Sequence, residues 1–168
     1  KNVEGSVLWV LKSNIWAGQN LKRQAEDRGV NAERIIFAER LPQSEHLARQ
    51  RLADLFLDTH PYNAGATASD ALRMGLPVLT YLGSSAVSRH AASVITALNL
   101  PELITTTLED YESLAIELAT DPEKLKIIKD KLVGNLSTAP LYNTSLFARN
   151  LESAYSKMYD RYQRGLDP

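Results

Sequence analysis

The chain has 168 residues, of which 44% are hydrophobic and 23% are charged, and its net charge is −1 at pH 7. This length fits one domain with a substantial core, and the nearly balanced charge disfavours nucleic acid as a partner. Cysteine is absent, which excludes disulfides and thiolate chemistry, and no apolar run approaches the roughly 18 residues of a membrane span.

Short apolar segments in the first two thirds of the chain predict β-strands. The first, Ser-Val-Leu-Trp-Val-Leu, is almost continuously apolar and predicts a strand buried on both faces, with Trp9 in the core. The five expected strands are residues 6–11, 34–37, 54–59, 77–81 and 103–104.

Helical segments follow these strands. Gly29, Gly75 and Gly165 stand where helices are expected to end, and Asp121-Pro122 is a typical helix start. Strands alternating with helices predict βαβ units and a parallel sheet, hence a Rossmann-like α/β fold with flanking helices. The expected helices are residues 19–28, 44–51, 67–74, 87–98, 107–119, 121–133 and 145–164.

The last helices have no strands between them. We therefore expect a single domain over residues 1–168, with a Rossmann-like core over about 1–140 and a C-terminal helix over about 141–168. This helix either packs on the flank of the sheet or reaches towards another lobe.

Ligands of open parallel sheets bind at the carboxyl ends of the strands, which directs attention to the loops after Leu11, Phe37 and Thr59. The last loop holds small residues, and the helix that follows offers unpaired N–H groups and a positive dipole end to a diphosphate. Thr67 adds a hydroxyl, and Asp70 can accept from a ribose hydroxyl. The alternative is that Thr67 and Asp70 form an ordinary capping box.

A second candidate is residues 41–49, where His46 and Arg49 are three positions apart and share one helical face. They can reach a base or a phosphate from there, or form a solvated surface. Elsewhere the histidines lack metal-ligand spacing, and nucleophile-elbow, Walker and GxGxxG motifs are absent.

Many short blocks across nearly the whole chain resemble the C-terminal catalytic lobe of the O-GlcNAc transferase and SPINDLY family. The lobe is one half of a glycosyltransferase-B fold, and tetratricopeptide repeats usually precede the catalytic region. The blocks are residues 6–12, 34–37, 42–49, 52–54, 57–59, 62–63, 67–72, 75–80, 88–93, 100–104, 111–112 and 140–144.

The resemblance assigns roles to particular residues. Leu41, Gln43, His46 and Arg49 are expected around the base and its neighbouring ribose, and Asp70 at the ribose hydroxyls. Gly65, Ala66 and Thr67 fall at the phosphate loop, where better-known members have His-Thr-Thr. Two side-chain donors are thus missing, and each lost bond to a charged phosphate costs about 1.5–3 kcal/mol, so we expect weak nucleotide binding.

The resemblance implies an inverting enzyme that transfers a sugar, first of all GlcNAc from UDP-GlcNAc, to Ser or Thr of a protein. It implies no cofactor and no metal. The family's phosphate-contacting lysine and its acceptor-side base have no counterpart here, so no catalytic residue is expected in this chain and the chain alone should not transfer sugar. The implied partners are an N-terminal catalytic lobe, tetratricopeptide repeats and a protein acceptor, with no nucleic acid and no membrane, in the cytoplasm.

Three alternatives stay open. The donor is GDP-fucose or UDP-glucose in a related enzyme. Alternatively, the chain is a degenerate, non-catalytic scaffold or binding domain, which the altered residues Gly65 and Ala66 keep possible. The last alternative, a response-regulator-like flavodoxin fold, needs acidic residues at strand ends, and Asp58 is the only suitable one.

Overall fold

A computed structural model of the protein describes residues 1–167 and shows an α/β fold in which all strand pairs are parallel. The predicted fold class is confirmed. The strands are β1 (Leu8–Leu11), β2 (Ile35–Ala38), β3 (Phe56–Leu57), β4 (Val78–Tyr81) and β5 (Ile104–Thr105).

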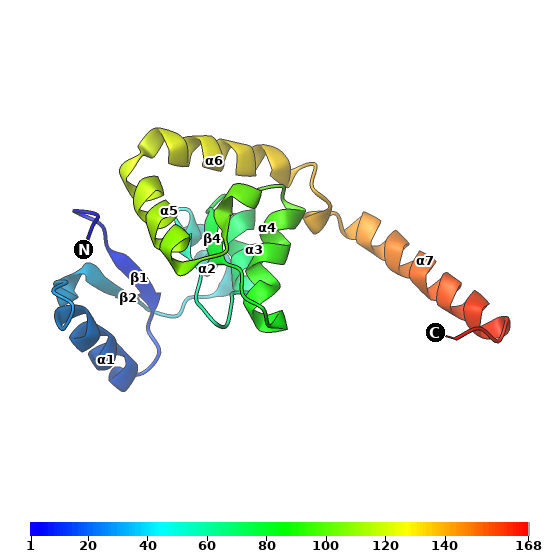
Figure 1. Cartoon of the computed structure of the whole chain (residues 1–168), viewed down its shortest axis with the longest axis horizontal. Helices are drawn as coiled ribbons and strands as arrows, with labels where there is room; N and C mark the ends of the chain where they lie inside the picture. The colour runs from blue at the N-terminus through cyan, green and yellow to red at the C-terminus, as the bar shows by residue number, and fades with distance from the viewer. Residues whose placement is uncertain (168) are drawn as a thin grey trace.

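The helices lie close to their predicted positions (Figure 1). Four short 3-10 helices, which the sequence did not indicate, join some of them: η1 (Ala32–Arg34), η2 (Ala86–Arg89), η3 (Pro101–Leu103) and η4 (Pro140–Tyr142). The α-helices are α1 (Ile15–Glu26), α2 (Gln43–Gln50), α3 (Ala66–Arg73), α4 (His90–Ala97), α5 (Leu108–Thr120), α6 (Pro122–Leu136) and α7 (Thr144–Gln163).

The strands form two hydrogen-bonded groups rather than one continuous sheet: β1 pairs with β2, and β3, β4 and β5 follow one another in that order. The expectation that residues 6–11 are buried on both faces is wrong, because Leu8 is 44% exposed, Trp9 39% and Leu11 41%. The reason is that β1 packs mainly on β2, and no helix within residues 1–167 packs extensively on its faces.

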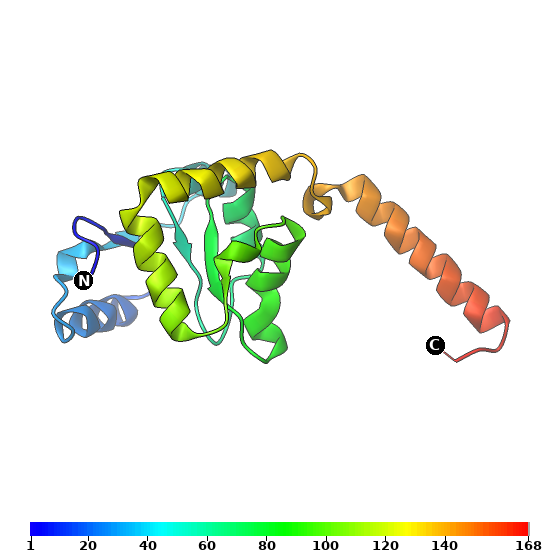
Figure 2. The same cartoon turned by 45° about the horizontal axis from the view of Figure 1, so that its top comes forward.

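The hydrophobic core surrounds β4. Helices α3 and α4 contact one another and β4, while α5 packs on β4 and against α6 (Figure 2). Every fully buried large apolar side chain in residues 1–167 belongs to this part of the molecule, and none to β1 or α1. The scaffold that positions the loop after β3 is therefore well packed. Its central side chains include Leu72, Val78, Leu79, Ile95, Leu103, Leu118 and Leu132.

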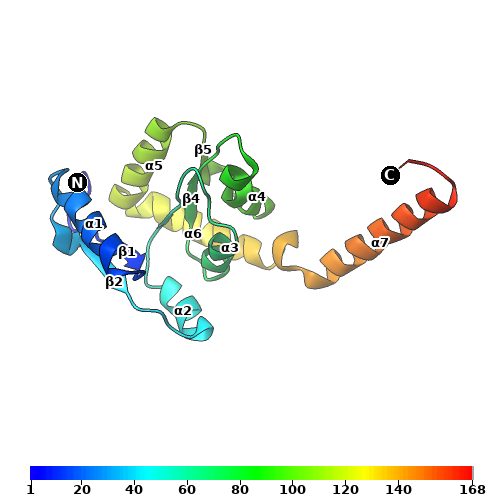
Figure 3. The same ribbon diagram turned by 90° about the horizontal axis from the view of Figure 1, so that it is seen from below.

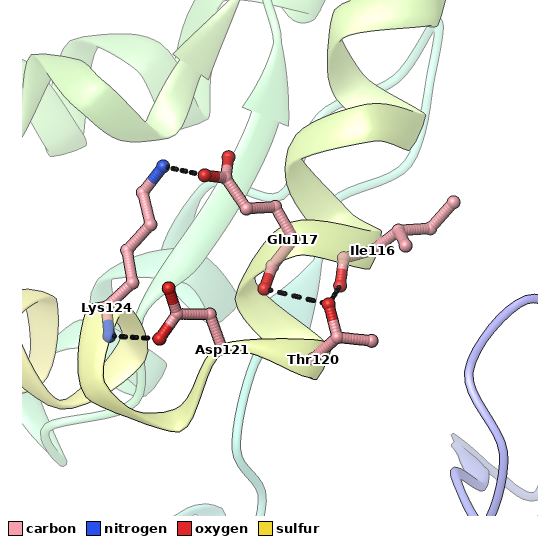
Figure 4. Close-up of polar contacts among 5 residues, drawn as sticks. All are labelled: Ile116, Glu117, Thr120, Asp121 and Lys124. Carbon is pink, nitrogen blue, oxygen red and sulfur yellow. Dashed lines mark hydrogen bonds and ion pairs between the residues drawn. The ribbon is translucent and has the colours of Figure 1, made fainter.

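Figure 4 shows the corner between α5 and α6, where the predicted helix start is confirmed. The Asp121 carboxylate accepts from the N–H of Lys124 at 2.9 Å, and Pro122 is the first residue of α6. The Lys124 ammonium pairs with Glu117 at 2.5 Å, and the Thr120 hydroxyl donates to the carbonyl of Ile116 at 2.8 Å. The Asp121 side chain thus gives an acceptor to one of the first N–H groups of α6, which have no partner inside the helix.

Helix α7 projects away from the rest of the molecule in all three views (Figures 1–3) and has no buried residue. It therefore does not pack on the flank of the sheet, the first of the two expected placements. Its exposed apolar side chains recur at helical spacing: Phe147, Leu151, Tyr155, Met158, Tyr159 and Tyr162. None of the helices within residues 1–167 has the length and hydrophobicity that crossing a membrane requires.

Candidate functional site

The loop between β3 and α3 ends at Gly65, which is the N-cap of α3 and supplies no side-chain cap. The first N–H bonded back to the cap is that of Ser69, which donates to the carbonyl of Gly65 at 3.1 Å. The alternative that Thr67 and Asp70 form a capping box is therefore wrong, because both residues lie inside the helix. The N–H groups of the first turn stay available to an anion.

A pocket of about 310 Å³ lies beside this helix start, lined among others by Thr59, Asn63, Gly65 and Thr67. Predicted residues Gly65 and Thr67 thus share one cavity, while Ala66, between them, is exposed on the first turn. The cavity follows the carboxyl end of β3, where ligands of parallel sheets bind.

Asp58 holds the loop in shape. Its buried carboxylate accepts from the Thr80 hydroxyl at 2.6 Å, the N–H of Ala64 at 2.7 Å and the N–H of Thr59 at 2.9 Å. A carboxylate with three internal donors and 7% exposure is a structural group. This geometry argues against the response-regulator alternative, which needs an accessible acid at this strand end.

Two further side chains position the same loop, and neither was expected to have a role from the sequence. Tyr111 of α5 donates its hydroxyl to the carbonyl of Asp58 at 2.9 Å. Burial, with a smaller effect of the Asp58 charge, raises the pKa of Tyr111, so its hydroxyl stays protonated. Asn63 is 1% exposed and donates to the carbonyl of Thr59 at 2.9 Å.

The Oδ1 atom of Asn63 is the one buried side-chain oxygen or nitrogen in residues 1–167 that lacks a hydrogen-bond partner. Native interiors rarely leave such an atom unpaired. Because Asn63 lines the cavity, the unpaired acceptor marks a polar wall there.

The second predicted segment forms α2, where His46 and Arg49 meet as their spacing indicated. The Arg49 guanidinium donates to Nδ1 of His46 at 2.8 and 3.2 Å, and also to the carbonyl of Glu39 at 2.6 Å. Nε2 of the same ring lies 3.2 Å from the side-chain amide nitrogen of Gln50. Arg49 also lies 5.9 Å from the ring of Trp9, within the range of a cation–π contact.

The other residues predicted for the base lie at the start of this helix. Leu41 is 41% exposed, and Gln43 is the first residue of α2 and is also exposed. Helices α2 and α3 contact one another, as Figure 3 shows from below. The predicted base segment and the predicted phosphate loop therefore belong to neighbouring elements.

Asp70 is the fifth residue of α3 and is partly buried. Its carboxylate makes no hydrogen bond or ion pair within residues 1–167, so it is free to accept from a ligand. Tyr142 of η4 contacts the same helix. Its hydroxyl donates to the carbonyl of Ser69 at 2.7 Å, and the Arg73 guanidinium lies 5.7 Å from its ring. Burial is the main cause that raises the pKa of Tyr142, and this tyrosine ties η4 to α3.

A second pocket, of about 340 Å³, follows β1 and is lined by Lys12, Asn14, Lys22 and Phe37, among others. Two of the three loops singled out in the sequence thus border cavities.

The described part of the chain contains no group of three or more His, Asp or Glu side chains placed to hold a metal ion.

Comparison with known proteins gives consistent matches over nearly all of the chain. The model of glycosyl transferase family 41 matches residues 1–151. The solved structure of a Thermobaculum terrenum O-GlcNAc transferase mutant superposes with a TM-score of 0.87 at 30% identity, covering 95% of this chain and 31% of that one.

Curated relatives agree. A UDP-N-acetylglucosamine--peptide N-acetylglucosaminyltransferase of Caenorhabditis elegans is 31% identical over 99% of this chain, and the probable enzyme SEC of Arabidopsis thaliana is 34% identical over all of it. The probable enzyme SPINDLY of Arabidopsis thaliana is 31% identical over 85% of the chain. The chain spans 14%, 17% and 16% of the lengths of these relatives.

Proposed function

This chain belongs to glycosyl transferase family 41, and on that premise we propose that it is the donor-binding part of a protein O-glycosyltransferase. The proposed donor is UDP-GlcNAc and the proposed acceptor a protein Ser or Thr, in line with the names of the relatives. The observation that carries the proposal is the cavity beside the uncapped start of α3, a helix that contacts α2 with its His46–Arg49 pair.

Each group has a distinct task in this proposal. The N–H groups at the start of α3 and the Thr67 hydroxyl bind the diphosphate, whose charge the helix dipole also favours. The free carboxylate of Asp70 accepts from the ribose hydroxyls. His46 and Arg49 lie against the base, with Leu41 and Gln43 at its rim.

Bond breaking needs more than this site. A departing diphosphate has to be neutralised and the acceptor hydroxyl deprotonated, and we assign no residue of this chain to either task. The proposal therefore includes an N-terminal catalytic lobe that supplies these groups. It also includes tetratricopeptide repeats and a cytoplasmic location for the whole protein. No metal or cofactor is part of it.

Calorimetric titration of the protein with UDP, GDP, UDP-GlcNAc, UDP-glucose and GDP-fucose tests the proposal. We expect UDP and UDP-GlcNAc to bind, GDP and GDP-fucose to bind at least tenfold more weakly, and Arg49→Ala to weaken UDP. Tighter binding of GDP or UDP-glucose assigns the site to another donor.

If no nucleotide binds, a non-catalytic scaffold is the better reading, which the absence of side-chain donors at Gly65 and Ala66 favours. Glu45→Gln, on the same helix but outside the proposed contacts, is the matched control for Arg49→Ala and should leave the affinity unchanged.

A further inference from the structure

His90, the first residue of α4, lies beside the phosphate loop, although it is 25 positions away from Gly65 in the sequence. A Cβ atom built on Gly65 would be 3.8 Å from Nδ1 of the His90 ring. The imidazole therefore stands next to the space that a side chain at position 65 would enter, at the edge of the cavity that Gly65 lines.

The His90 ring is not engaged elsewhere. The residue is exposed, and its imidazole makes no hydrogen bond, ion pair or ring contact within the part of the chain that the structure describes. An imidazole has one or two N–H donors, depending on protonation. At least one donor is thus available to a ligand in the cavity.

The surroundings favour an anion. Gly65 is the N-cap of α3 and His90 begins α4, so two eight-residue helices present their N-terminal ends to one place. Both ends carry partial positive charge. The buried carboxylate of Asp58 also lines the cavity, but three internal donors partly balance its charge.

The polar wall of the cavity is a separate sign of a ligand. Asn63 is 1% exposed, lines the same cavity and keeps an unpaired oxygen. A bound polar molecule or its water shell can satisfy that oxygen. Positive helix ends, a free imidazole and an unpaired acceptor together describe a built pocket for an anionic, hydroxyl-bearing ligand.

We propose that His90 is a phosphate-contacting residue of this site, and that its imidazole donates to the diphosphate from beside Gly65. The inference rests on the proposed function. It supplies from α4 a donor that the loop itself lacks at positions 65 and 66.

The test compares binding of UDP and uridine by calorimetry. We expect His90→Ala to raise the dissociation constant for UDP about tenfold, as loss of a hydrogen bond to a charged group does, and to change that for uridine less than twofold. His90→Gln, which keeps a donor, should lose less. Ser93→Ala, one turn along α4 and equally exposed, is the control and should change neither constant.

A second variant moves the imidazole. Gly65→His in the His90→Ala background should recover most of the UDP affinity, since position 65 borders the same space. Gly65 has a φ of −102°, outside the left-handed region that favours glycine.

The outcomes separate the two proposals. Unchanged UDP affinity in His90→Ala, while Asp70→Asn weakens UDP, overturns the role of His90 and leaves the proposed function standing. An equal loss for UDP and uridine also overturns it, because the effect would then not depend on phosphate. Absence of UDP binding in the unaltered protein overturns both.

Discussion

Asp70 shows what a free polar group contributes. Its carboxylate has no partner in residues 1–167, unlike Asp58 with its three donors. The two acids therefore separate by environment into one that holds the loop and one that is available to a ligand. Residue type alone does not show this difference: Asp58 lies near the end of a predicted strand and Asp70 inside a predicted helix, and two donors to Asp58, Ala64 and Thr80, come from later segments of the chain.

Asp70→Asn should weaken UDP binding about tenfold, because hydrogen bonds to charged groups contribute about 1.5–3 kcal/mol. It should leave the thermal midpoint within about 1 °C, since no internal contact is lost. Calorimetry and a melting curve measure both. Asp130→Asn, which alters an exposed acid on α6 paired with Lys126, should change neither. A large loss of stability in Asp70→Asn would instead make Asp70 a structural residue.

Tyr111 makes the free energy of unfolding depend on pH in the alkaline range. Burial raises its pKa above the ordinary value of 10.0, so the unfolded chain loses this proton at a lower pH than the folded protein does. The native state then binds more protons, and stability falls as pH rises above about 10.

Urea unfolding at pH 8 and at pH 11 measures this dependence. At pH 8, Tyr111→Phe should cost about 0.5–1.5 kcal/mol, the contribution of its hydrogen bond to Asp58. The difference from the unaltered protein should shrink at pH 11, because the phenylalanine cannot ionise. A difference that stays constant across this range would contradict the assignment.

At the scale of elements, local signals predicted the fold well where a helix has its own start and stop. Asp121 caps α6 as expected, and Gly29, Gly75 and Gly165 all adopt positive φ. The burial of β1 and the position of His90 were not predictable in this way. Both depend on which distant segments meet, and no local pattern encodes that. The same limit hid the role of Tyr142, which reaches α3 from 73 residues away.

Two glycine-to-alanine changes should have opposite effects. Gly75 ends α3 with φ of +81°, so alanine there is strained and should destabilise the protein by about 1 kcal/mol. Gly134 lies inside α6 with nothing within 4 Å of an added Cβ, so alanine there should stabilise it by about 0.5–1 kcal/mol. Urea unfolding measures both. Effects of the same sign would contradict the placement of Gly75 after a helix end and of Gly134 inside a helix.

At the scale of the whole molecule, packing is uneven. Leu79 on β4 is fully buried, whereas Leu8 on β1 is 44% exposed. The site draws on both parts, since the cavity lies by β3 and the Arg49 side chain approaches Trp9 of β1. The proposed donor site is therefore well packed at its phosphate end and less well packed at its base end.

Leucine-to-alanine changes on the two strands test this difference. Leu79→Ala should cost about 2–5 kcal/mol of unfolding free energy, as for other buried leucines. Leu8→Ala should cost about 1 kcal/mol or less, because roughly half of its side chain is already in contact with water. Chemical denaturation of both variants provides the comparison. Similar losses would mean that β1 is covered by something beyond its pairing with β2.

The projecting helix α7 also sets the size of the molecule in solution. Its 20 residues span about 30 Å at 1.5 Å per residue, while a compact chain of this length has a radius of gyration of about 15 Å. Small-angle scattering should therefore give a radius of gyration clearly above that value. Deleting residues 144–163 should lower the radius to about that value. The same radius with and without these residues would mean that the helix folds back onto the rest of the molecule. The main contacts of α7 lie at η4, so a tilt of about 20° there moves the far end of the helix by about 10 Å.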